Sequence, residues 1–205
     1  MATDFDAAAA TWDDDPVRRA RTEALAEAVR AVVALGPATA VLEYGAGTGL
    51  LSHRLAPYVG AITVADAAPG MVDVASARIA ESGLGHLNAR RLDLTRDPVP
   101  PERYDLVVSI MAMHHVTDVP RVLAAFHELL LPGGSVAIAD LDPDPHNHFH
   151  AHDFDGHRGF DREVLASWLA DAGFTDVGFS TPHTVTKEVD GVSREFPLFL
   201  AVGRR

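Results

Sequence analysis

The segment from Val41 to Ser52, V-L-E-Y-G-A-G-T-G-L-L-S, constrains the fold more than any other part of the sequence. The apolar residues 40–42 are typical of a short buried strand. Glu43 follows them, then three glycines at alternate positions, and then leucines at helical spacing. Glycines allow positive φ and let a ligand approach the main chain, and a helix start offers free N–H groups. The pattern predicts a strand, a ligand-binding loop and a helix.

Two details of this segment indicate the kind of ligand. A dinucleotide site has the pattern G-x-G-x-x-G, with the pyrophosphate at the helix start, but Leu50 stands in place of the third glycine. Glu43 would repel a pyrophosphate, whereas its charge suits a ligand that carries an ammonium and a sulfonium group. An NAD(P)-linked oxidoreductase is therefore a disfavoured alternative, and no tyrosine of the chain has a lysine four residues later.

The same residues resemble motif I of the class I S-adenosylmethionine-dependent methyltransferases, in particular the small bacterial type 11/12 methyltransferase domain. The resemblance covers residues 12–205 and implies S-adenosylmethionine (AdoMet) as cofactor and S-adenosylhomocysteine (AdoHcy) as product. The order of the predicted elements indicates an α/β, doubly wound, Rossmann-like sheet. The family adds the seven-strand arrangement with the last strand antiparallel. A non-catalytic AdoMet-binding module stays open as an alternative.

The predicted cofactor site lies at the ends of successive strands. Asp66 ends the second strand about 20 residues after the glycine loop, where an acid reaches ribose hydroxyls; a helix cap is its alternative role. The resemblance implies that Asp93 lies beside the adenine amino group and that carbonyls after strand 104–110 receive the methionine ammonium. Trp12 and Met71 could instead be plain apolar packing residues. The predicted set is Trp12, Glu43, Gly45, Ala46, Gly47, Gly49, Asp66, Ala67, Met71, Asp93, Leu94, Ser109 and Ile110.

Length and pattern predict a single domain over residues 1–205. We expect a loose segment over 1–11 and an N-terminal helical cap over 12–35. A substrate lid is predicted over 142–160. The other predicted helices cover 69–81 and 118–131 and begin again after Asp161. The other predicted strands cover 61–66, 86–94, 104–110, 135–140, 175–181 and 195–203, with a turn at Asp190-Gly191.

Composition narrows the function. The formal net charge of −12 disfavours nucleic acid and acidic membranes as partners, so a small-molecule acceptor is expected. Without cysteine, a thiolate nucleophile for cytosine methylation is impossible. No basic and apolar leader opens the sequence, so we expect a cytoplasmic enzyme, and a monomer or a homodimer are both compatible with it.

Histidines carry the predicted acceptor chemistry. Methyl transfer from a sulfonium needs positioning and exclusion of water, and a hydroxyl acceptor also needs a base, which suits histidine. We therefore expect O-methylation, with N- and C-methylation left open. His115 is the preferred candidate over His114, with His148 and His150 of the lid as competitors.

The segment 142–157 contains five of the 11 histidines. On a strand or on a helix, some of its histidines would share one face. We expect a lid without a metal, and keep a solvated loop and a divalent metal site as alternatives. The candidate ligands are His146, His148, His150 and His152.

Overall fold

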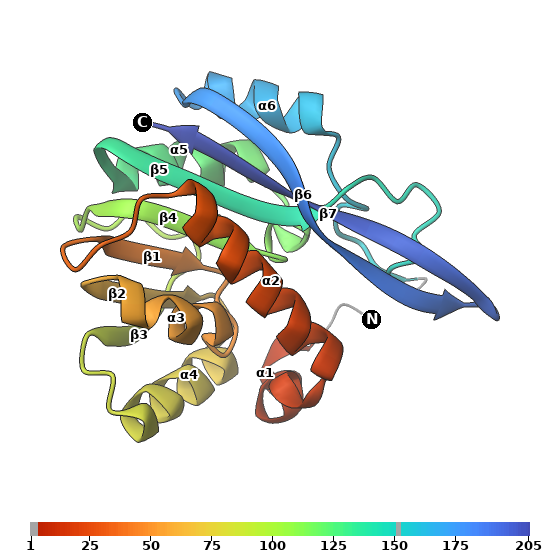
Figure 1. The fold of residues 1–205 in the computed structure, drawn as a ribbon, viewed down its shortest axis with the longest axis horizontal. Coiled ribbons are helices and arrows are strands. Elements are labelled where there is room, and N and C mark those ends of the chain that lie inside the picture. Colours follow the sequence, from red (N-terminus) through yellow and green to blue (C-terminus); the bar gives the residue numbers. More distant parts are fainter. Residues whose placement is uncertain (1–3, 151–152) are drawn as a thin grey trace.

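The computed structural model describes residues 4–150 and 153–205. This part of the chain forms one seven-stranded sheet in the order β3-β2-β1-β4-β5-β7-β6, with helices on both faces (Figure 1). The strands are β1 (Ala40–Tyr44), β2 (Ala61–Asp66), β3 (Leu87–Arg91), β4 (Tyr104–Ile110), β5 (Leu130–Leu141), β6 (Thr175–Val189) and β7 (Val192–Arg204). The helices are α1 (Phe5–Ala8), α2 (Pro16–Val32), α3 (Leu50–Leu55), α4 (Pro69–Ser82), α5 (Val119–Leu129) and α6 (Arg162–Asp171), with 3₁₀ turns η1 (Ala9–Asp14), η2 (Ala56–Tyr58) and η3 (Met113–His115).

The sheet confirms the predicted doubly wound α/β architecture. Strands β1 to β5 pair in parallel, whereas β7 runs antiparallel to both β5 and β6. The strand order reverses at β1, whose Val41 pairs with Ile62 on one side and Leu106 on the other. In open α/β sheets a ligand crevice forms beyond the carboxyl ends of the strands at such a reversal. The ends of β1 and β4 are therefore where a site is expected.

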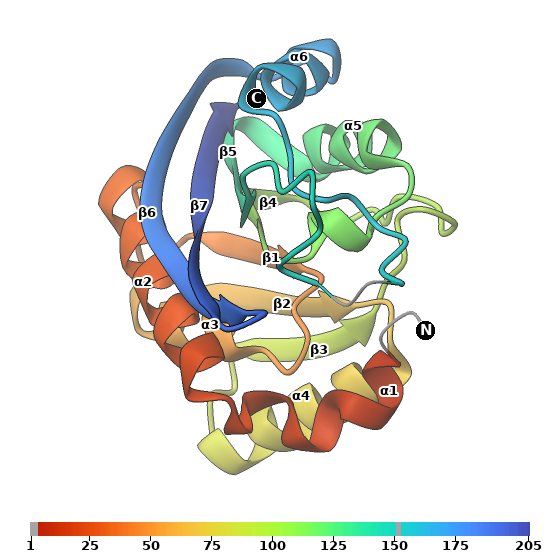
Figure 2. The same ribbon diagram turned by 90° about the vertical axis from the view of Figure 1, so that its right-hand side faces the viewer.

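Two cores hold the helices onto the sheet. Helices α2, α3 and α4 pack on one face through residues such as Leu25 and Leu51, and α5 and α6 pack on the other through Phe126 and Leu169 (Figure 2). The strands of the parallel part are mostly buried, because both of their faces are covered. Within the described ranges, no helix combines the length and the apolar character needed to cross a membrane.

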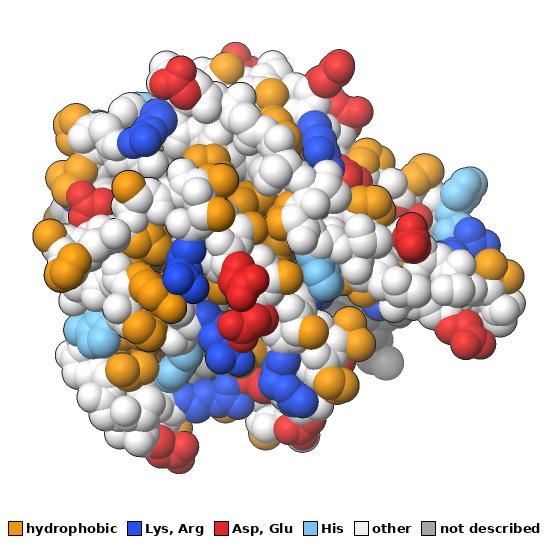
Figure 3. Space-filling view, viewed as in Figure 1, with side chains coloured by type: hydrophobic (Ala, Val, Ile, Leu, Met, Phe, Trp, Pro, Cys, Tyr) orange, Lys and Arg blue, Asp and Glu red, His pale blue; other side chains and the backbone are white. Residues whose placement is uncertain are grey.

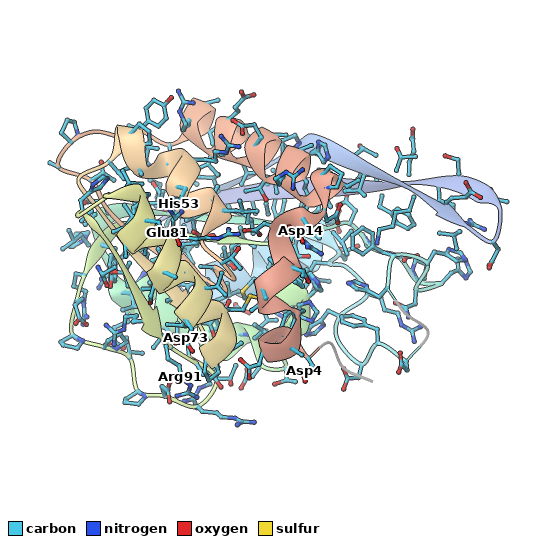
Figure 4. All side chains as sticks on the ribbon, turned by 90° about the horizontal axis from the view of Figure 1, so that it is seen from below. Asp4, Asp14, His53, Asp73, Glu81 and Arg91 are labelled. Carbon is cyan, nitrogen blue, oxygen red and sulfur yellow. The ribbon has the colours of Figure 1, made fainter. Side chains whose placement is uncertain are left out.

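The N-terminal segment corrects the predicted loose stretch over 1–11 for residues 5–11, whereas residues 1–3 of that prediction lie outside the described residues. Helix α1 and turn η1 cover Phe5–Asp14, and Figure 4 shows this stretch, between the labelled Asp4 and Asp14, lying along α4. Asp4 caps α1 by accepting the Ala7 N–H, and Asp6 Oδ1 accepts the Gly70 N–H at 2.6 Å. The prediction was wrong because a contact with a distant helix, which local composition does not encode, fixes this stretch. The helix within the predicted cap over 12–35 is α2, which ends at Val32.

The last three strands are longer than predicted, and β3 is shorter. Strand β5 begins at Leu130, directly after α5, so the predicted helix over 118–131 ends two residues early. Strands β6 and β7 continue as a two-stranded ribbon that projects from the body of the molecule (Figure 1). The turn between them falls at Asp190-Gly191 as predicted, with φ of 52° and 75°. The added residues of β6 and β7 are mostly polar, so no apolar pattern in the sequence indicates these extensions. Only the pairing between the two strands shows them.

The segment 142–160 connects β5 to α6 without a helix or strand among its described residues. It packs against the hairpin ribbon: the rings of Phe149 and Phe196 lie 5.3 Å apart, and Lys187 Nζ donates to the Phe149 carbonyl at 2.9 Å. Its far end returns to the sheet where the Phe160 N–H donates to the Leu141 carbonyl. The segment therefore lies beside the carboxyl end of β5.

Candidate cofactor and acceptor site

The glycine loop after β1 adopts a shape that side chains would prevent. Gly45 and Gly47 have φ of +67° and +55°, which L-residues other than glycine rarely adopt. A Cβ on Gly45 would lie 2.4 Å from the Cβ of Ala112, in the loop after β4. The loops after β1 and β4 thus meet closely, and their main chain faces the crevice.

A cavity of about 620 Å³ opens at this point, within the range of small-molecule sites. Its walls come from the ends of β1, β2 and β4, the loop after β3, and the N-terminal helices. Most of the predicted cofactor residues line it: Trp12, Glu43, Gly45, Ala46, Gly47, Asp66, Ala67, Met71, Asp93 and Ile110. Residues that the sequence prediction did not include also line it, among them Arg18, Arg21, Thr95, Met111 and Ala112.

Three predicted residues lie behind the wall of the cavity. Gly49 is the N-cap of α3, and its N–H donates to the Ala46 carbonyl. Leu94 is buried, and its N–H donates to the Tyr44 hydroxyl. Ser109 is fully buried within β4. They do not line the cavity, and their bonds and packing hold the loops that do.

Glu43 is a buried acid at the end of β1, and its side chain lines the cavity. Its Oε2 accepts the Ser52 N–H at 2.9 Å and the Ser52 hydroxyl, which ties the strand end to α3. Burial raises the pKa of Glu43 to about 7, against the effect of these two bonds. A cationic group in the cavity would favour its ionised form.

The other two acids are held by backbone donors. Asp66 accepts the Gly47 N–H at 2.7 Å through Oδ2 and the Ala68 N–H at 2.9 Å through Oδ1. Burial raises the pKa of Asp66, although these bonds oppose the shift. Asp93 Oδ1 accepts from the N–H and the hydroxyl of Thr95. Each carboxylate retains lone pairs for a ligand, since a carboxylate offers about four acceptor positions.

The N-terminal segment closes the cavity from above the glycine loop. Trp12 lines the cavity, and its Nε1 would lie 3.5 Å from a Cβ placed on Gly47. Asp13 accepts from the buried Thr48 hydroxyl through both carboxylate oxygens, at 2.8 and 2.9 Å, and forms an ion pair with Arg78 of α4. The segment is therefore bonded both to the loop and to α4.

Histidines from η3 and from the 142–160 segment lie together at the other wall. His114 is buried, and its Nδ1 lies 2.7 Å from Asp140 Oδ1, while its N–H donates to Asp140 Oδ2. Burial alone would raise the pKa of Asp140, but His114 and the backbone donors lower it. The rings of His115 and His150 lie 4.1 and 4.9 Å from that of His114.

Of the four histidines predicted for the acceptor side, His115 alone lines the cavity in the described part of the chain. Burial, with the neighbouring His114, lowers the pKa of His115 to about 3. His150 is stacked on Phe154 at 3.8 Å, and burial lowers its pKa to about 4. Both imidazoles are therefore neutral near pH 7.

The structure places His148 elsewhere, which corrects its predicted place beside the acceptor. It lies 3.8 Å from Asp144 in a separate cleft next to β7, and its ring is 5.3 Å from that of His146. Within residues 4–150 and 153–205, no group of three or more His, Asp or Glu side chains is arranged to hold a metal. His152 lies outside the described residues.

Comparison with known proteins places this geometry in a family. Residues 41–134 match the family model described as "Methyltransferase domain". The chain is 37% identical over 146 residues to the biotin biosynthesis bifunctional protein BioCD of Bordetella avium, covering 69% of this chain and 30% of that protein. It is 35% identical over 101 residues to a ubiquinone biosynthesis O-methyltransferase of Cereibacter sphaeroides, covering 49% of this chain and 40% of the relative.

A solved structure, a SAM-dependent methyltransferase of Aquifex aeolicus, superposes with a TM-score of 0.71 at 18% identity and covers 97% of both chains. Residues 41–134 therefore match a methyltransferase domain, and the chain shares the fold of this solved methyltransferase. Both findings bear out the predicted resemblance to the class I AdoMet-dependent methyltransferases. The chain spans between 30 and 53% of the length of the curated relatives described as methyltransferases or BioCD.

The site fits AdoMet, the cofactor that the resemblance predicts. A nucleoside needs acceptors for its ribose hydroxyls and adenine amino group, and Asp66 and Asp93 retain free lone pairs at the cavity wall. A cationic amino-acid part needs negative charge, which Glu43 supplies once ionised. Gly45 and Gly47 line the cavity without side chains, and a Cβ on Gly47 would lie between the loop and the side chains of Trp12 and Met71.

Proposed function

We propose that this protein transfers a methyl group from AdoMet to a small-molecule acceptor, and that the methylated atom is oxygen. The observation that carries the proposal is the single cavity that joins three strand-end acids to His115 and the loop after β4. AdoMet supplies a methyl group that its sulfonium has already activated. The protein then needs to hold both reactants in line and exclude water.

The proposed cofactor roles follow from the donor and acceptor chemistry. Asp66 accepts from the ribose hydroxyls, and Asp93 accepts from the adenine amino group. Glu43 offsets the positive charge of the amino-acid part. The α1–η1 segment, through Trp12 and the bond between Asp13 and Thr48, limits water access from above.

We propose that His115 orients the acceptor hydroxyl as a neutral hydrogen-bond acceptor. A general base works best with a pKa near the working pH, and a pKa of about 3 makes His115 a poor proton acceptor. The buried pair of His114 and Asp140 fixes η3, because the carboxylate holds both the imidazole and the backbone N–H of His114. His114 therefore positions His115.

The net charge of the protein and the mixed charges on its surface favour a small, diffusible acceptor. The net charge of −12 opposes binding to long nucleic acid or to acidic membranes. On the face that carries α2, Figure 3 shows Lys and Arg side chains interspersed with Asp and Glu. The similarity to a ubiquinone biosynthesis O-methyltransferase supports oxygen as the methylated atom. We also propose that the protein acts in the cytoplasm, as a monomer or a homodimer.

Two measurements test the proposed function. Calorimetry with AdoMet and AdoHcy should give dissociation constants in the micromolar range, common for enzyme ligands. Incubation with methyl-labelled AdoMet and a metabolite extract should then yield a labelled small molecule in which the labelled methyl group is bonded to oxygen. Absence of binding would refute the cofactor assignment. Binding without label transfer would indicate a non-catalytic AdoMet-binding module, and a label on nitrogen or carbon would refute O-methylation.

A further inference from the structure

Among the described residues, three arginines line the cavity, and two of them, Arg18 and Arg21, come from α2. The third, Arg96, lies 3.8 Å from Asp93. Arg18 has partners: its guanidinium lies 3.8 Å from the Trp12 ring centroid, donates to the Trp12 carbonyl, and is 3.8 Å from an Asp15 oxygen. Arg21 differs, because its Nε is buried and has no hydrogen-bond partner among the residues that the structure describes.

A buried guanidinium nitrogen without a hydrogen-bond partner is costly, so its presence needs a reason. Burial lowers the pKa of Arg21 to about 10, which leaves it charged at neutral pH. The acids that act on it are already engaged: Asp140 is bonded to His114, and Asp15 pairs with Arg18. The missing partner is therefore expected to come from a ligand.

A lysine reinforces the charge of Arg18 and Arg21. Lys187 of β6 is the only lysine of the chain, and its amine is bonded to the Phe149 carbonyl in the 142–160 segment. Burial lowers the pKa of Lys187, and repulsion from Arg21 and Arg18 contributes to the shift. Helix α2 packs against β6, which brings these three residues from distant parts of the sequence to one place. In a chain with a net charge of −12, such a group of cations favours an anionic ligand.

The partner of Arg21 could be a carboxylate of the cofactor or one of the acceptor. AdoMet carries a sulfonium and an ammonium against one carboxylate, so it is a net cation, and the acids that line the cavity, among them Glu43 and Asp66, suit that charge. We propose that Arg21, supported by Arg18 and Lys187, binds a carboxylate on the methyl acceptor, which makes the acceptor a small organic acid. Arginine suits this role because its planar fork can hold a carboxylate through two parallel hydrogen bonds. This inference rests on the proposed function.

The test separates acidic from neutral acceptors. A metabolite extract is split on an anion-exchange resin into a retained, anionic fraction and a flow-through fraction. Each fraction is incubated with methyl-labelled AdoMet and with wild type, Arg21→Gln, Arg21→Lys or Arg30→Gln. Arg30 is the matched control, because it lies on the same helix but its guanidinium stacks on Tyr58, outside the cavity. AdoHcy binding and thermal melting of each variant confirm that it is folded.

We expect wild type and Arg30→Gln to label a compound of the retained fraction. Arg21→Gln should reduce the rate of that transfer by about 10- to 100-fold, the usual effect of losing a charge-assisted hydrogen bond, with an AdoHcy dissociation constant within about twofold of wild type. Arg21→Lys should recover part of the rate, since it retains the charge.

Three results would overturn the inference. One is label found only in products of the flow-through fraction. Another is an Arg21→Gln rate equal to that of wild type. The third is a loss of AdoHcy affinity in Arg21→Gln that accounts for the whole rate change, because Arg21 would then hold the carboxylate of the cofactor. Failure of wild type to bind AdoHcy, or binding without label transfer in either fraction, would instead refute the proposed function itself.

Discussion

The two ends of the cavity are built in different ways. The cofactor end consists of backbone loops and acids at the ends of β1 and β2 and after β3, each acid fixed by hydrogen bonds to neighbouring N–H groups. At the acceptor end, side chains of α2 and η3 line the cavity, and the 142–160 segment and the hairpin pack next to them; an arginine Nε there has no hydrogen-bond partner in the described residues. The cofactor end is pre-formed by local structure, whereas the acceptor end depends on tertiary packing.

This difference separates what the family shares from what distinguishes one enzyme from another. Main-chain donors and strand-end acids suit a single ligand that is the same for all members. Side chains contributed by distant elements can change without disturbing the sheet. We therefore expect substitutions at the cofactor end to alter the binding of AdoHcy, and substitutions at the acceptor end to alter turnover alone.

The largest effect is expected for Asp66→Ala. The change removes the carboxylate that holds the Gly47 and Ala68 N–H groups and, in our proposal, the ribose. AdoHcy affinity should fall about 10- to 100-fold by calorimetry, corresponding to roughly 1–3 kcal/mol of charge-assisted hydrogen bonding. Asp66→Glu should be milder. Asp73→Ala, on the exposed side of α4 (Figure 4), is the control, and equal affinities for both alanine variants would exclude the ribose role.

Glu43→Gln should remove a pH dependence of cofactor binding. In wild type the pKa of Glu43 is about 7 before binding, so affinity for cationic AdoMet should rise as pH increases from 6 to 8. The glutamine variant should bind about 10-fold more weakly at pH 8 and similarly to wild type at pH 5.5. A pH slope that persists in Glu43→Gln would show that another group is responsible.

Glu43→Gln should also change how the free energy of unfolding depends on pH. Because the folded-state pKa lies above the unfolded value of 4.5, the folded protein holds its proton longer. The free energy of unfolding should thus fall as pH rises from 4.5 to 7, by about 3 kcal/mol from this group. Glu43→Gln without cofactor should lack this contribution, which chemical denaturation at pH 5 and 8 would measure. An identical pH response in both proteins would contradict burial of an ionisable Glu43.

His115→Ala should lower turnover about 10-fold while AdoHcy affinity stays unchanged, because His115 orients the acceptor and does not touch the cofactor end. The acidic limb of the pH–rate profile should persist, since its source is Glu43 and the pKa of His115 is about 3. If turnover fell by more than about 100-fold and the acidic limb also disappeared, His115 would be the general base. His114→Ala should instead lower the melting temperature, because Asp140 would lose its buried partner.

The smallest effect is expected for Thr48→Val, which keeps the shape of the side chain but removes its bond to Asp13. AdoHcy affinity should fall about threefold, as for one buried hydrogen bond, and the dissociation rate should increase because the α1–η1 segment is held less firmly. Stopped-flow displacement measures this rate. Thr117→Val, in a residue that lines the cavity without this bond, is the comparison. Equal AdoHcy dissociation rates for Thr48→Val and Thr117→Val would show that the α1–η1 segment does not cover the bound cofactor.

The sequence predicts most of the cofactor end because its information is local. Glycine spacing, the position of Glu43 and the acid Asp66 about 20 residues later all follow from one strand–loop–helix unit and the next strand. The exceptions are instructive: Gly49, Leu94 and Ser109 belong to the same motifs but support the wall from behind. A motif identifies the segment, whereas the direction of each side chain depends on packing.

The acceptor end is far less predictable. Arg21 reads as an ordinary polar position of an amphipathic helix, and only the packing of α2 against β6 brings it near Lys187. His114 in η3 pairs with Asp140 near the end of β5, 26 positions later in the sequence. No rule of residue spacing indicates this pair. Order in residues 5–14 also depends on a partner, α4, that lies far along the chain.

A crystal structure of the AdoHcy complex tests the central claim most directly. The account predicts the ribose hydroxyls within hydrogen-bond distance of Asp66, the adenine amino group beside Asp93, and the amino-acid ammonium next to Glu43 and the loop of Gly45. The Arg21 guanidinium should remain clear of the ligand's carboxylate. AdoHcy bound outside this cavity, or bound with its ribose away from Asp66, would contradict the account.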